Sequence, residues 1–234
     1  MLIEGKTKTV QIGPQENTVL LVAKDALTGG DAAQKEDILQ IGRHKTAQAA
    51  NAFRTIEAEG VPTAFIDQFA EDSLLCDACD MLPLEFVVRR YAWGSYLKRN
   101  PGMKTETGKP HRFDLPVWEL FHKHSLITPP AADTTTIMGE NDAREHFLKD
   151  GTWANGVYTD PYIELATDGW GLHNPKAPIN KGEALHTIEP TISDAELENA
   201  IYNIVMPAFQ ALESAWLEVE TQHGPVHLAD IKFE

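Results

Sequence analysis

The chain has 234 residues, 42% of them hydrophobic, and a formal net charge of −15, which suits one large globular domain or two smaller lobes. So acidic a composition excludes a DNA- or RNA-binding role, because nucleic-acid phosphates are bound by clustered lysines and arginines. We expect no membrane span and no signal peptide, and two cysteines favour a reducing, cytoplasmic location over a disulfide framework.

The first part of the chain predicts a β-hairpin followed by a helix. Residues 1 to 25 alternate in polarity around a Gly13-Pro14 turn. The paired glycines of Leu27-Thr28-Gly29-Gly30-Asp31 then predict a loop. A helical period of apolar residues runs from Gln34 to Glu59, and Gly60 is expected to end it.

The middle of the chain gives weaker signals. Phe86-Val87-Val88 predicts a short strand that Trp93-Gly94-Ser95 breaks. Residues 100 to 190 hold most of the prolines, so we expect long surface excursions with little regular structure there, apart from a short helix over 140–148.

The last part predicts a long helix and a terminal strand. Ser193 and Glu196 have the spacing of a capping box, and an apolar face follows as far as Val219. Pro207 is expected to kink or restart this helix, and Gly224 to end it. Residues 228–234 then alternate as a strand.

Both ends of the chain carry charges that suit a nucleotide triphosphate. Lys6 and Lys8 share one face of the first extended segment beside Gly5, and two ammonium groups there suit a polyphosphate. Asp230, Lys232 and Glu234 share one face of the last strand, and carboxylates suit Mg²⁺. Each pattern alone also fits an ordinary solvated strand face.

A second constellation lies between Glu85 and Arg99. Glu85, Val87 and Arg89 share a strand face, and two basic pairs, Arg89-Arg90 and Lys98-Arg99, bracket the Gly94-Ser95 turn. Such a bend can hold a phosphate or carboxylate, with arginine as the bidentate donor. A charged edge hairpin is the alternative interpretation.

Three other patterns are interpreted as structural when taken alone. Asp160-Pro161 fits a stiff turn. Cys76 and Cys79 have CxxC spacing, but no second ligand pair matches them as a zinc site would require. His122-Lys123-His124 fits a charged strand or loop better than a metal site.

Taken in order, these segments resemble one family, SAICAR synthetase (phosphoribosylaminoimidazole-succinocarboxamide synthase). The segments that carry the resemblance are 4–8, 29–31, 59–63, 80–89, 94–99, 119–123, 160–163 and 230–234. The resemblance implies an α+β fold with antiparallel sheets and flanking helices, in a kinase-like and ATP-grasp-like two-lobed architecture. It places a nucleotide-binding lobe at 1–80 and a larger substrate- and ATP-binding lobe at 81–234.

The implied activity is an ATP- and Mg²⁺-dependent ligase of de novo purine synthesis. It joins L-aspartate to the carboxylate of carboxyaminoimidazole ribonucleotide through an acyl phosphate. Phosphorylation supplies the leaving group that a carboxylate lacks, and the protein's main task is positioning. The resemblance also implies a homo-oligomer.

The resemblance assigns roles residue by residue. ATP is expected to meet Lys6, Lys8, Glu85, Lys123 and the backbone near Met81. The imidazole ribonucleotide is expected to meet Arg89, Ser95 and Arg99, and L-aspartate to meet Asp160. Lys232 and Glu234 match a Lys-x-Glu pair whose glutamate binds the metal. The residues expected to take part in catalysis are Lys123, Asp160 and Lys232.

Two features separate the chain from the family pattern. The stretch from Ser125 to Asp160 is longer than the link expected before the Asp-Pro. The family also continues past the Lys-x-Glu with a strand that carries a second metal-binding aspartate. We therefore expect a fragment, half of a split enzyme, or a shortened relative. Two alternatives stay open: a non-catalytic nucleotide-binding relative, and a ligase that uses another carboxylate in a specialised pathway.

Overall fold

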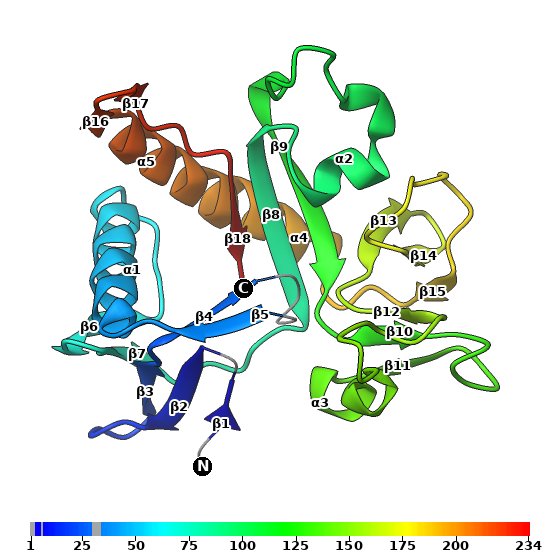
Figure 1. The fold of residues 1–234 in the computed structure, drawn as a ribbon, viewed down its shortest axis with the longest axis horizontal. Coiled ribbons are helices and arrows are strands. Elements are labelled where there is room, and N and C mark those ends of the chain that lie inside the picture. The colour runs from blue at the N-terminus through cyan, green and yellow to red at the C-terminus, as the bar shows by residue number, and fades with distance from the viewer. Residues whose placement is uncertain (1–2, 6, 30–33) are drawn as a thin grey trace. The chain divides into compact units, whose positions relative to one another are not determined.

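The structure is a computed structural model that describes residues 3–5, 7–29 and 34–234. Its residues group into two compact units (Figure 1). Unit 1 comprises Met1–Asp80 with Gln210–Ala215, and unit 2 comprises Met81–Phe209 with Trp216–Glu234. This grouping concerns packing alone, so the division into a nucleotide lobe and a substrate lobe stays a prediction.

Unit 1 contains an antiparallel five-stranded sheet in the order β1-β2-β3-β7-β6. Its strands are β1 (Ile3–Glu4), β2 (Lys8–Ile12), β3 (Thr18–Ala23), β6 (Phe65–Ala70) and β7 (Ser73–Asp77). The predicted N-terminal hairpin is β2 and β3, with Lys8 opposite Ala23 and Ile12 opposite Val19. Both cysteines are free thiols, Cys76 buried in β7 and Cys79 exposed.

The segment before the first helix differs from its prediction. Residues expected as a loop and as the helix start form a second hairpin, β4 (Ala26–Gly29) with β5 (Gln34–Asp37). Helix α1 therefore begins later, at Ile41, and runs to Ala58. The Asp25 carboxylate accepts hydrogen bonds from the backbone N–H groups of Gln40 and Gly42, which fixes this start. Gly60, with φ 81°, follows its end as expected.

Unit 2 is built on an antiparallel six-stranded sheet in the order β15-β14-β13-β9-β8-β18. Its strands are β8 (Leu84–Tyr91), β9 (Arg112–His122), β13 (Tyr162–Ala166), β14 (Gly169–His173), β15 (His186–Ile188) and β18 (Asp230–Phe233). The terminal strand lies beside β8, with Asp230 opposite Arg89 and Lys232 opposite Val87 (Figure 1). Segments more than 130 residues apart in sequence are thus neighbours.

The prediction of little regular structure over 100–190 is wrong. This region supplies β9, β13, β14 and β15, and β14 is buried along its whole length. It also forms a three-stranded sheet of β11 (Thr136–Met138), β10 (Ser125–Ile127) and β12 (Val157–Tyr158). The short helix expected over 140–148 is α3 (Glu140–Ala143) with the 3-10 turn η2 (Arg144–His146). Pro116 lies inside β9, where the pairing with β8 shifts its register, and an irregular position of this kind accommodates a proline.

The predicted break after β8 is present, and the element that follows it is a short helix, which the sequence had not predicted. Gly94 has φ 58°, and α2 (Ser95–Arg99) follows with the 3-10 turn η1 (Pro101–Met103). α2 is only five residues long, so it owes its position to contacts that its side chains make with the sheet. Those contacts, made mainly by Arg99, belong to the site described below.

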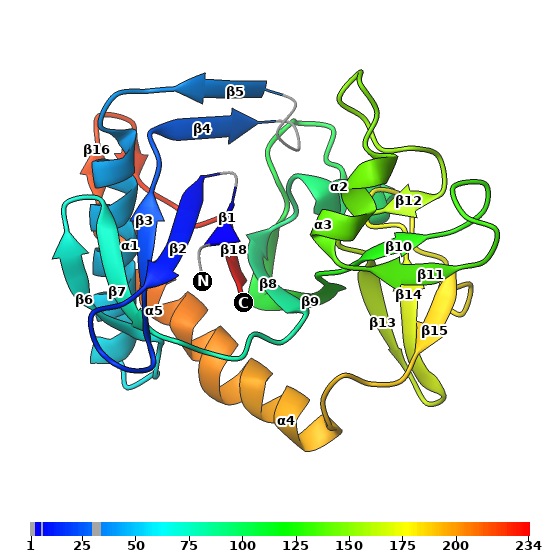
Figure 2. The same ribbon diagram turned by 90° about the horizontal axis from the view of Figure 1, so that it is seen from below.

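One long helix covers one face of the six-stranded sheet. It consists of α4 (Asp194–Asn199), a π-helical turn η3 (Ala200–Val205) and α5 (Met206–Leu217), which Figure 2 shows as nearly continuous. The predicted capping box is present, with Ser193 and Glu196 bonded reciprocally. Pro207 does not end the helix: it lies in the first turn of α5, directly after the π-helical turn.

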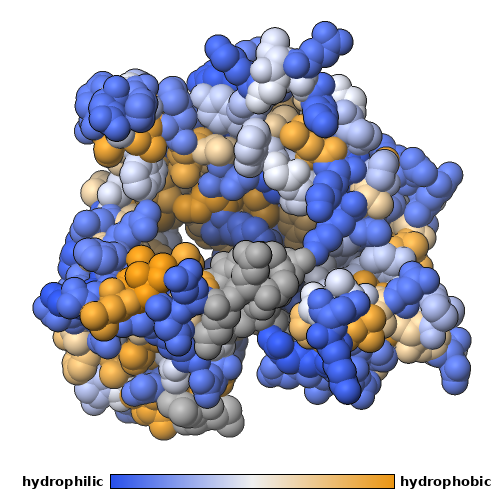
Figure 3. Space-filling model, viewed as in Figure 1, coloured by the Kyte–Doolittle hydropathy of each residue, from blue (hydrophilic) through white to orange (hydrophobic). Residues whose placement is uncertain are grey.

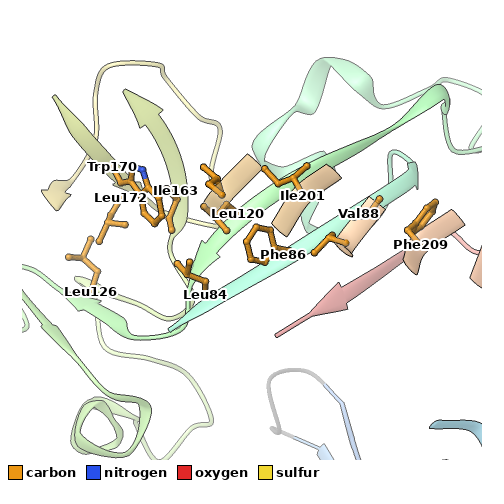
Figure 4. Close-up of a cluster of buried hydrophobic side chains, with 12 residues drawn as sticks. Leu84, Phe86, Val88, Leu120, Leu126, Ile163, Trp170, Leu172, Ile201 and Phe209 are labelled. Carbon is orange, nitrogen blue, oxygen red and sulfur yellow. The ribbon is translucent and has the colours of Figure 1, made fainter. Parts of the chain in front are cut away.

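The core of unit 2 lies between this helix and the sheet (Figure 4). The helix contributes Ile201 and Phe209, and the sheet contributes Phe86, Val88 and Leu120, all buried. Because side chains alternate along a strand, the neighbours of these core residues point to the opposite face of the sheet. That opposite face carries the charges.

The helix ends at Leu217, earlier than Gly224, which instead lies in a small hairpin. This hairpin is β16 (Glu220–Thr221) with β17 (Gly224–Pro225). Hydrophilic residues dominate the face seen in Figure 3, as the acidic composition predicts. None of the described helices combines the length and apolar character needed to cross a bilayer.

Candidate active site

Nine charged side chains extend from β8, β9, β18, α2 and the adjoining turns, on the side of the sheet opposite the helix. We call them the charged face: Glu85, Arg89, Arg99, Glu119, Lys123, Asp160, Asp230, Lys232 and Glu234. Strand alternation explains the arrangement, since Leu84, Phe86 and Val88 face the core while Glu85 and Arg89 point away from it. All nine belong to unit 2.

Lys123 is the centre of one half of the charged face. Its Nζ lies 3.0 Å from Glu234 Oε1, 3.2 Å from Glu85 Oε2 and 3.5 Å from Asp160 Oδ1. Burial alone would lower the pKa of Lys123, but the charges of Asp160, Glu85 and Glu234 outweigh it and raise that pKa. The side chain is therefore a fixed positive charge at neutral pH.

Glu85 is shared between two lysines. Its side chain is only 3% exposed, and Lys232 Nζ lies 2.7 Å from Oε1 while Lys123 holds Oε2. Burial favours the neutral acid, but the hydrogen bonds and charges of Lys232 and Lys123 prevail and lower the pKa of Glu85. The predicted Glu85, Lys123 and Lys232 thus form one ionised cluster.

Asp160 joins this cluster from a strained turn. Its φ of 48° is unusual for a residue with a side chain, and the following Pro161 adds to the restriction. Burial raises the pKa of Asp160. The positive charge of Lys123 opposes this rise, and the negative charge of Glu85 adds to it. Strained backbone persists where the surroundings enforce it, and functional sites are enriched in it. The Asp160-Pro161 turn therefore also places a carboxylate beside Lys123.

Two arginines form the other half of the charged face around Glu119. Arg99 donates to both carboxylate oxygens of Glu119, with Nη2 2.7 Å from Oε1 and 2.8 Å from Oε2. Arg89 Nε donates to Glu119 Oε2 at 2.5 Å, and Arg89 Nη1 donates to Asp230. Two guanidinium groups and two carboxylates thus balance in charge.

Arg99 is further held by aromatic rings and a carbonyl group. Its guanidinium carbon lies 4.8 Å from the ring centroid of Phe121 and 5.7 Å from that of Tyr162. Nη1 also donates to the carbonyl oxygen of Pro175 at 2.6 Å. With its side chain 1% exposed, Arg99 is a fixed part of the interior.

The remaining predicted residues belong to other segments of the chain. Ser95 begins α2, four residues before Arg99. Met81 is 62% exposed in the segment between β7 and β8. Lys8 is exposed at the start of β2 in unit 1, and Lys6 lies outside the described residues. The prediction that these lysines face the acids of β18 joins residues of the two units and stays a prediction.

The two carboxylates that hold the arginines were not predicted as site residues. Glu119 was given no role, and Asp230 was considered only with Glu234 as a carboxylate suited to Mg²⁺, whereas the structure pairs it with Arg89. Glu119 carried a usable signal, because it interrupts the otherwise apolar Trp118-Glu119-Leu120-Phe121. A carboxylate in a buried strand requires a cationic partner. The identity of that partner required the fold.

A metal ion has one candidate ligand on the charged face, the predicted Glu234, whose side chain is 46% exposed. Within residues 3–5, 7–29 and 34–234, no group of three or more His, Cys, Asp or Glu side chains is arranged to hold a metal. Mg²⁺ commonly takes one or two carboxylates and completes its shell with water and nucleotide phosphates, so one glutamate fits an ion that arrives with a nucleotide.

His122, beside Lys123, is expected to make the fold acid-sensitive. Burial, reinforced by the nearby His124, lowers its pKa to about 4. Its Nδ1 accepts the backbone N–H of His124 at 3.2 Å, which only an unprotonated nitrogen can do. Unfolding exposes a histidine that protonates near its ordinary pKa of 6.5, so stability should fall as pH drops from 6.5 towards 4.

When the pH is lowered from 7 to 4.5, protonation of this histidine in the unfolded chain should lower the free energy of unfolding by about 2–3 kcal/mol. His122→Asn keeps an acceptor and should remove that part of the pH dependence. Urea unfolding at both pH values measures it, with the exposed His44→Asn in α1 as control. An unchanged pH dependence in His122→Asn would contradict the prediction.

Comparison with known proteins decides the family. Residues 1–150 match the family model described as SAICAR synthetase. A phosphoribosylaminoimidazole-succinocarboxamide synthase of Roseiflexus sp. is 33% identical over 186 residues, covering 73% of this chain and 73% of the relative. The chain belongs to the SAICAR synthetase family. The resemblance found in the sequence is thereby confirmed.

Other relatives show how much of a family member the chain spans. A synthase of Herpetosiphon aurantiacus is 31% identical over 65% of this chain and 66% of its own length. A bifunctional purine synthesis protein purC/E of Dictyostelium discoideum is 33% identical over 64% of this chain but only 14% of its own length. The chain thus spans about two thirds to three quarters of the single-function relatives.

Solved structures of SAICAR synthetases share the fold. The phosphoribosylaminoimidazole-succinocarboxamide synthase of Ehrlichia chaffeensis superposes with a TM-score of 0.61 at 16% identity, covering 98% of this chain and 72% of that one. A SAICAR synthetase in complex with ADP gives the same TM-score at 20% identity, covering 99% and 73%. The predicted antiparallel sheets with flanking helices are confirmed.

Proposed function

We propose that this protein joins L-aspartate to the carboxylate of carboxyaminoimidazole ribonucleotide, with ATP as the phosphoryl donor, in de novo purine synthesis. Two observations support the proposal. The chain belongs to a family whose relatives are named for this synthase. The charged face also brings together the lysines and carboxylates that the family pattern assigned to the reaction.

The observation that carries the proposal is the set of contacts around Lys123. Its ammonium group gathers Glu85 from β8, Asp160 from the strained turn and Glu234 from the chain end. Three segments of the family pattern, distant in sequence, thus converge on a fourth. Ordinary solvated strand faces and turns would not require such convergence. The contacts around Lys123 therefore favour a shared site over these alternative interpretations.

The charged face suits the formation and use of an acyl phosphate. A carboxylate oxygen of the ribonucleotide attacks the γ-phosphorus, and ADP leaves. The ammonium group of L-aspartate loses a proton, and the resulting amine attacks the acyl carbon. Phosphate leaves as the C–N bond forms, and the nitrogen releases a further proton to solvent. Lys123 and Lys232 would offset negative charge on the transferring phosphoryl group. Asp160 would orient the amine of L-aspartate by ion pairing.

ATP and Mg²⁺ are proposed to bind in the manner that the family pattern assigns. Lys6, Lys8 and the backbone near Met81 would hold the nucleotide, and Glu85 would order the lysines beside it. Glu234 would hold Mg²⁺, which supplies charge neutralisation for the phosphates. This arrangement requires the kinase-like and ATP-grasp-like two-lobed architecture, which is part of the proposal. We also propose a cytoplasmic homo-oligomer.

The imidazole ribonucleotide is proposed to bind at the arginine half of the charged face. Arg89 and Ser95 would provide donors for its phosphate or carboxylate, and Arg99, whose Nε, Nη1 and Nη2 already donate to Glu119 and Pro175, would act through Glu119. Both arginines are already bound to Glu119, so their guanidinium planes are fixed before a ligand arrives. Such preorganisation lowers the entropic cost of binding.

Phosphate release by the 234-residue chain tests the proposed function. We expect release from ATP that requires Mg²⁺, L-aspartate and carboxyaminoimidazole ribonucleotide together, with a product absorbing as the succinocarboxamide. ATP binding without turnover would favour the non-catalytic relative instead. Turnover only with a different amino acid or acceptor would favour the ligase of a specialised pathway. Omission of each substrate in turn is the matched control.

A further inference from the structure

Arg89 is bound by two carboxylates that differ sharply in exposure. Glu119 has a side chain 6% exposed, whereas that of Asp230 is 35% exposed. The Arg89 side chain between them is 4% exposed. The solvent-facing side of this ion-pair chain is therefore a carboxylate, and an anion arriving from solvent meets Asp230 before it meets Arg89.

Glu119 is committed to its position. It accepts four hydrogen bonds, one from Arg89 and three from Arg99, and Arg99 is itself held by the Pro175 carbonyl and two aromatic rings. Its removal would leave the buried Arg99 without its carboxylate partner and Arg89 with Asp230 alone. No incoming anion replaces Glu119 without dismantling that packing.

Asp230 is held much less firmly. Among the residues that the structure describes, the Asp230 carboxylate forms hydrogen bonds and ion pairs with Arg89 alone. Its backbone belongs to β18, which four paired positions fix against β8. A change of side-chain rotamer alone therefore frees Arg89, and the strand need not move. The freed carboxylate is close enough to solvent to be hydrated at little cost.

Resting on the ribonucleotide site proposed above, we propose that Asp230 is an exchangeable internal anion of Arg89. In the unliganded protein it occupies the donors that a carboxylate or phosphate of the ribonucleotide takes on binding. Glu119 stays in place throughout and keeps the guanidinium oriented. The exchange keeps Arg89 paired in both states, and it rejects neutral ligands, which cannot replace the carboxylate.

Competition and structural support predict opposite changes in ligand affinity when the bond between Asp230 and Arg89 is weakened. If Asp230 competes with the ligand, weakening its bond to Arg89 makes the ligand bind more tightly. If Asp230 only supports the site, the same change leaves affinity unaltered or reduces it. Asp230→Asn preserves size and one acceptor oxygen while removing the charge, so the two roles are separable.

The experiment is titration calorimetry of the full chain with carboxyaminoimidazole ribonucleotide, without ATP or L-aspartate. We expect Asp230→Asn to bind about 3- to 10-fold more tightly than the parent chain, the range for a partly exposed ion pair. Asp168→Asn, an exposed site in the turn between β13 and β14, removes the same charge away from Arg89 and should change affinity less than 2-fold. Asp230→Glu restores the charge and should return affinity towards that of the parent.

Aminoimidazole ribonucleotide, which lacks only the carboxylate, separates the two anionic groups. A gain with both ligands assigns Arg89 to the phosphate, and a gain confined to the carboxylated ligand assigns it to the carboxylate. Equal or weaker binding of both ligands to folded Asp230→Asn overturns the exchange. Absence of binding to the parent chain would instead count against the proposed function, and thermal unfolding verifies that each variant is folded.

Discussion

Lys123→Met is expected to lower the rate of ATP-, aspartate- and ribonucleotide-dependent phosphate release by about 10²- to 10³-fold, the usual cost of removing one preorganised electrostatic group. The ammonium group lies within 3.5 Å of carboxylates from three segments, so its loss removes the positive charge that these carboxylates share. Methionine keeps most of the buried stem and removes only the charge and its donors.

Lys149→Met serves as the matched control, because Lys149 is exposed after the η2 turn and lies outside the charged face. Its activity should stay within 2-fold of the parent rate. Steady-state phosphate release and the unfolding midpoint are measured for both variants. A folded Lys123→Met chain that retains more than a third of the rate would rule out the role proposed for this lysine.

Glu119→Ala is expected to lower the free energy of unfolding by about 3–5 kcal/mol, the cost of leaving a buried charge without its partner. Here two guanidinium groups, those of Arg89 and Arg99, lose that partner together. A loss of this size is a large share of the ~5–15 kcal/mol that a folded domain has in total. Glu119→Gln keeps one acceptor oxygen and should lose less.

Urea unfolding of both variants measures the effect, with Glu198→Ala on the exposed side of α4 as control. That control should stay within about 0.5 kcal/mol of the parent, as exposed substitutions do. A loss below 1 kcal/mol for Glu119→Ala would mean that water or another anion satisfies the arginines, and the fixed role given to Glu119 would be wrong.

The sequence predicted the elements whose signals are local. The capping box at Ser193 and the alternation of Asp230, Lys232 and Glu234 each lie within a few residues, and the structure has them. Helix α1 was placed seven residues early because Ile38 continues its apolar period, and the four polar residues Gln34–Asp37 before it show no strand alternation. Those residues gain more from pairing with β4 than from a further turn of helix.

The sequence could not predict the partners on the charged face. Arg89 and Asp230 are 141 positions apart, and only the pairing of β8 with β18 brings them together. The region 100–190 was misjudged for a similar reason. Strands such as Gly169–His173 are buried on both faces, so they lack the alternation by which a half-exposed strand is detected.

The pairing of β18 with β8 is linked to the electrostatics of the sheet. Asp230 and Lys232 neutralise Arg89 and Glu85, whose side chains on the neighbouring strand are 4% and 3% exposed. Separation of the two strands would therefore leave opposite charges unpaired in a low-dielectric interior at the same moment. Amide protons of β18 should consequently exchange more slowly than those of β15, the strand at the opposite edge of the sheet, since opening β18 carries this electrostatic penalty in addition to its lost hydrogen bonds.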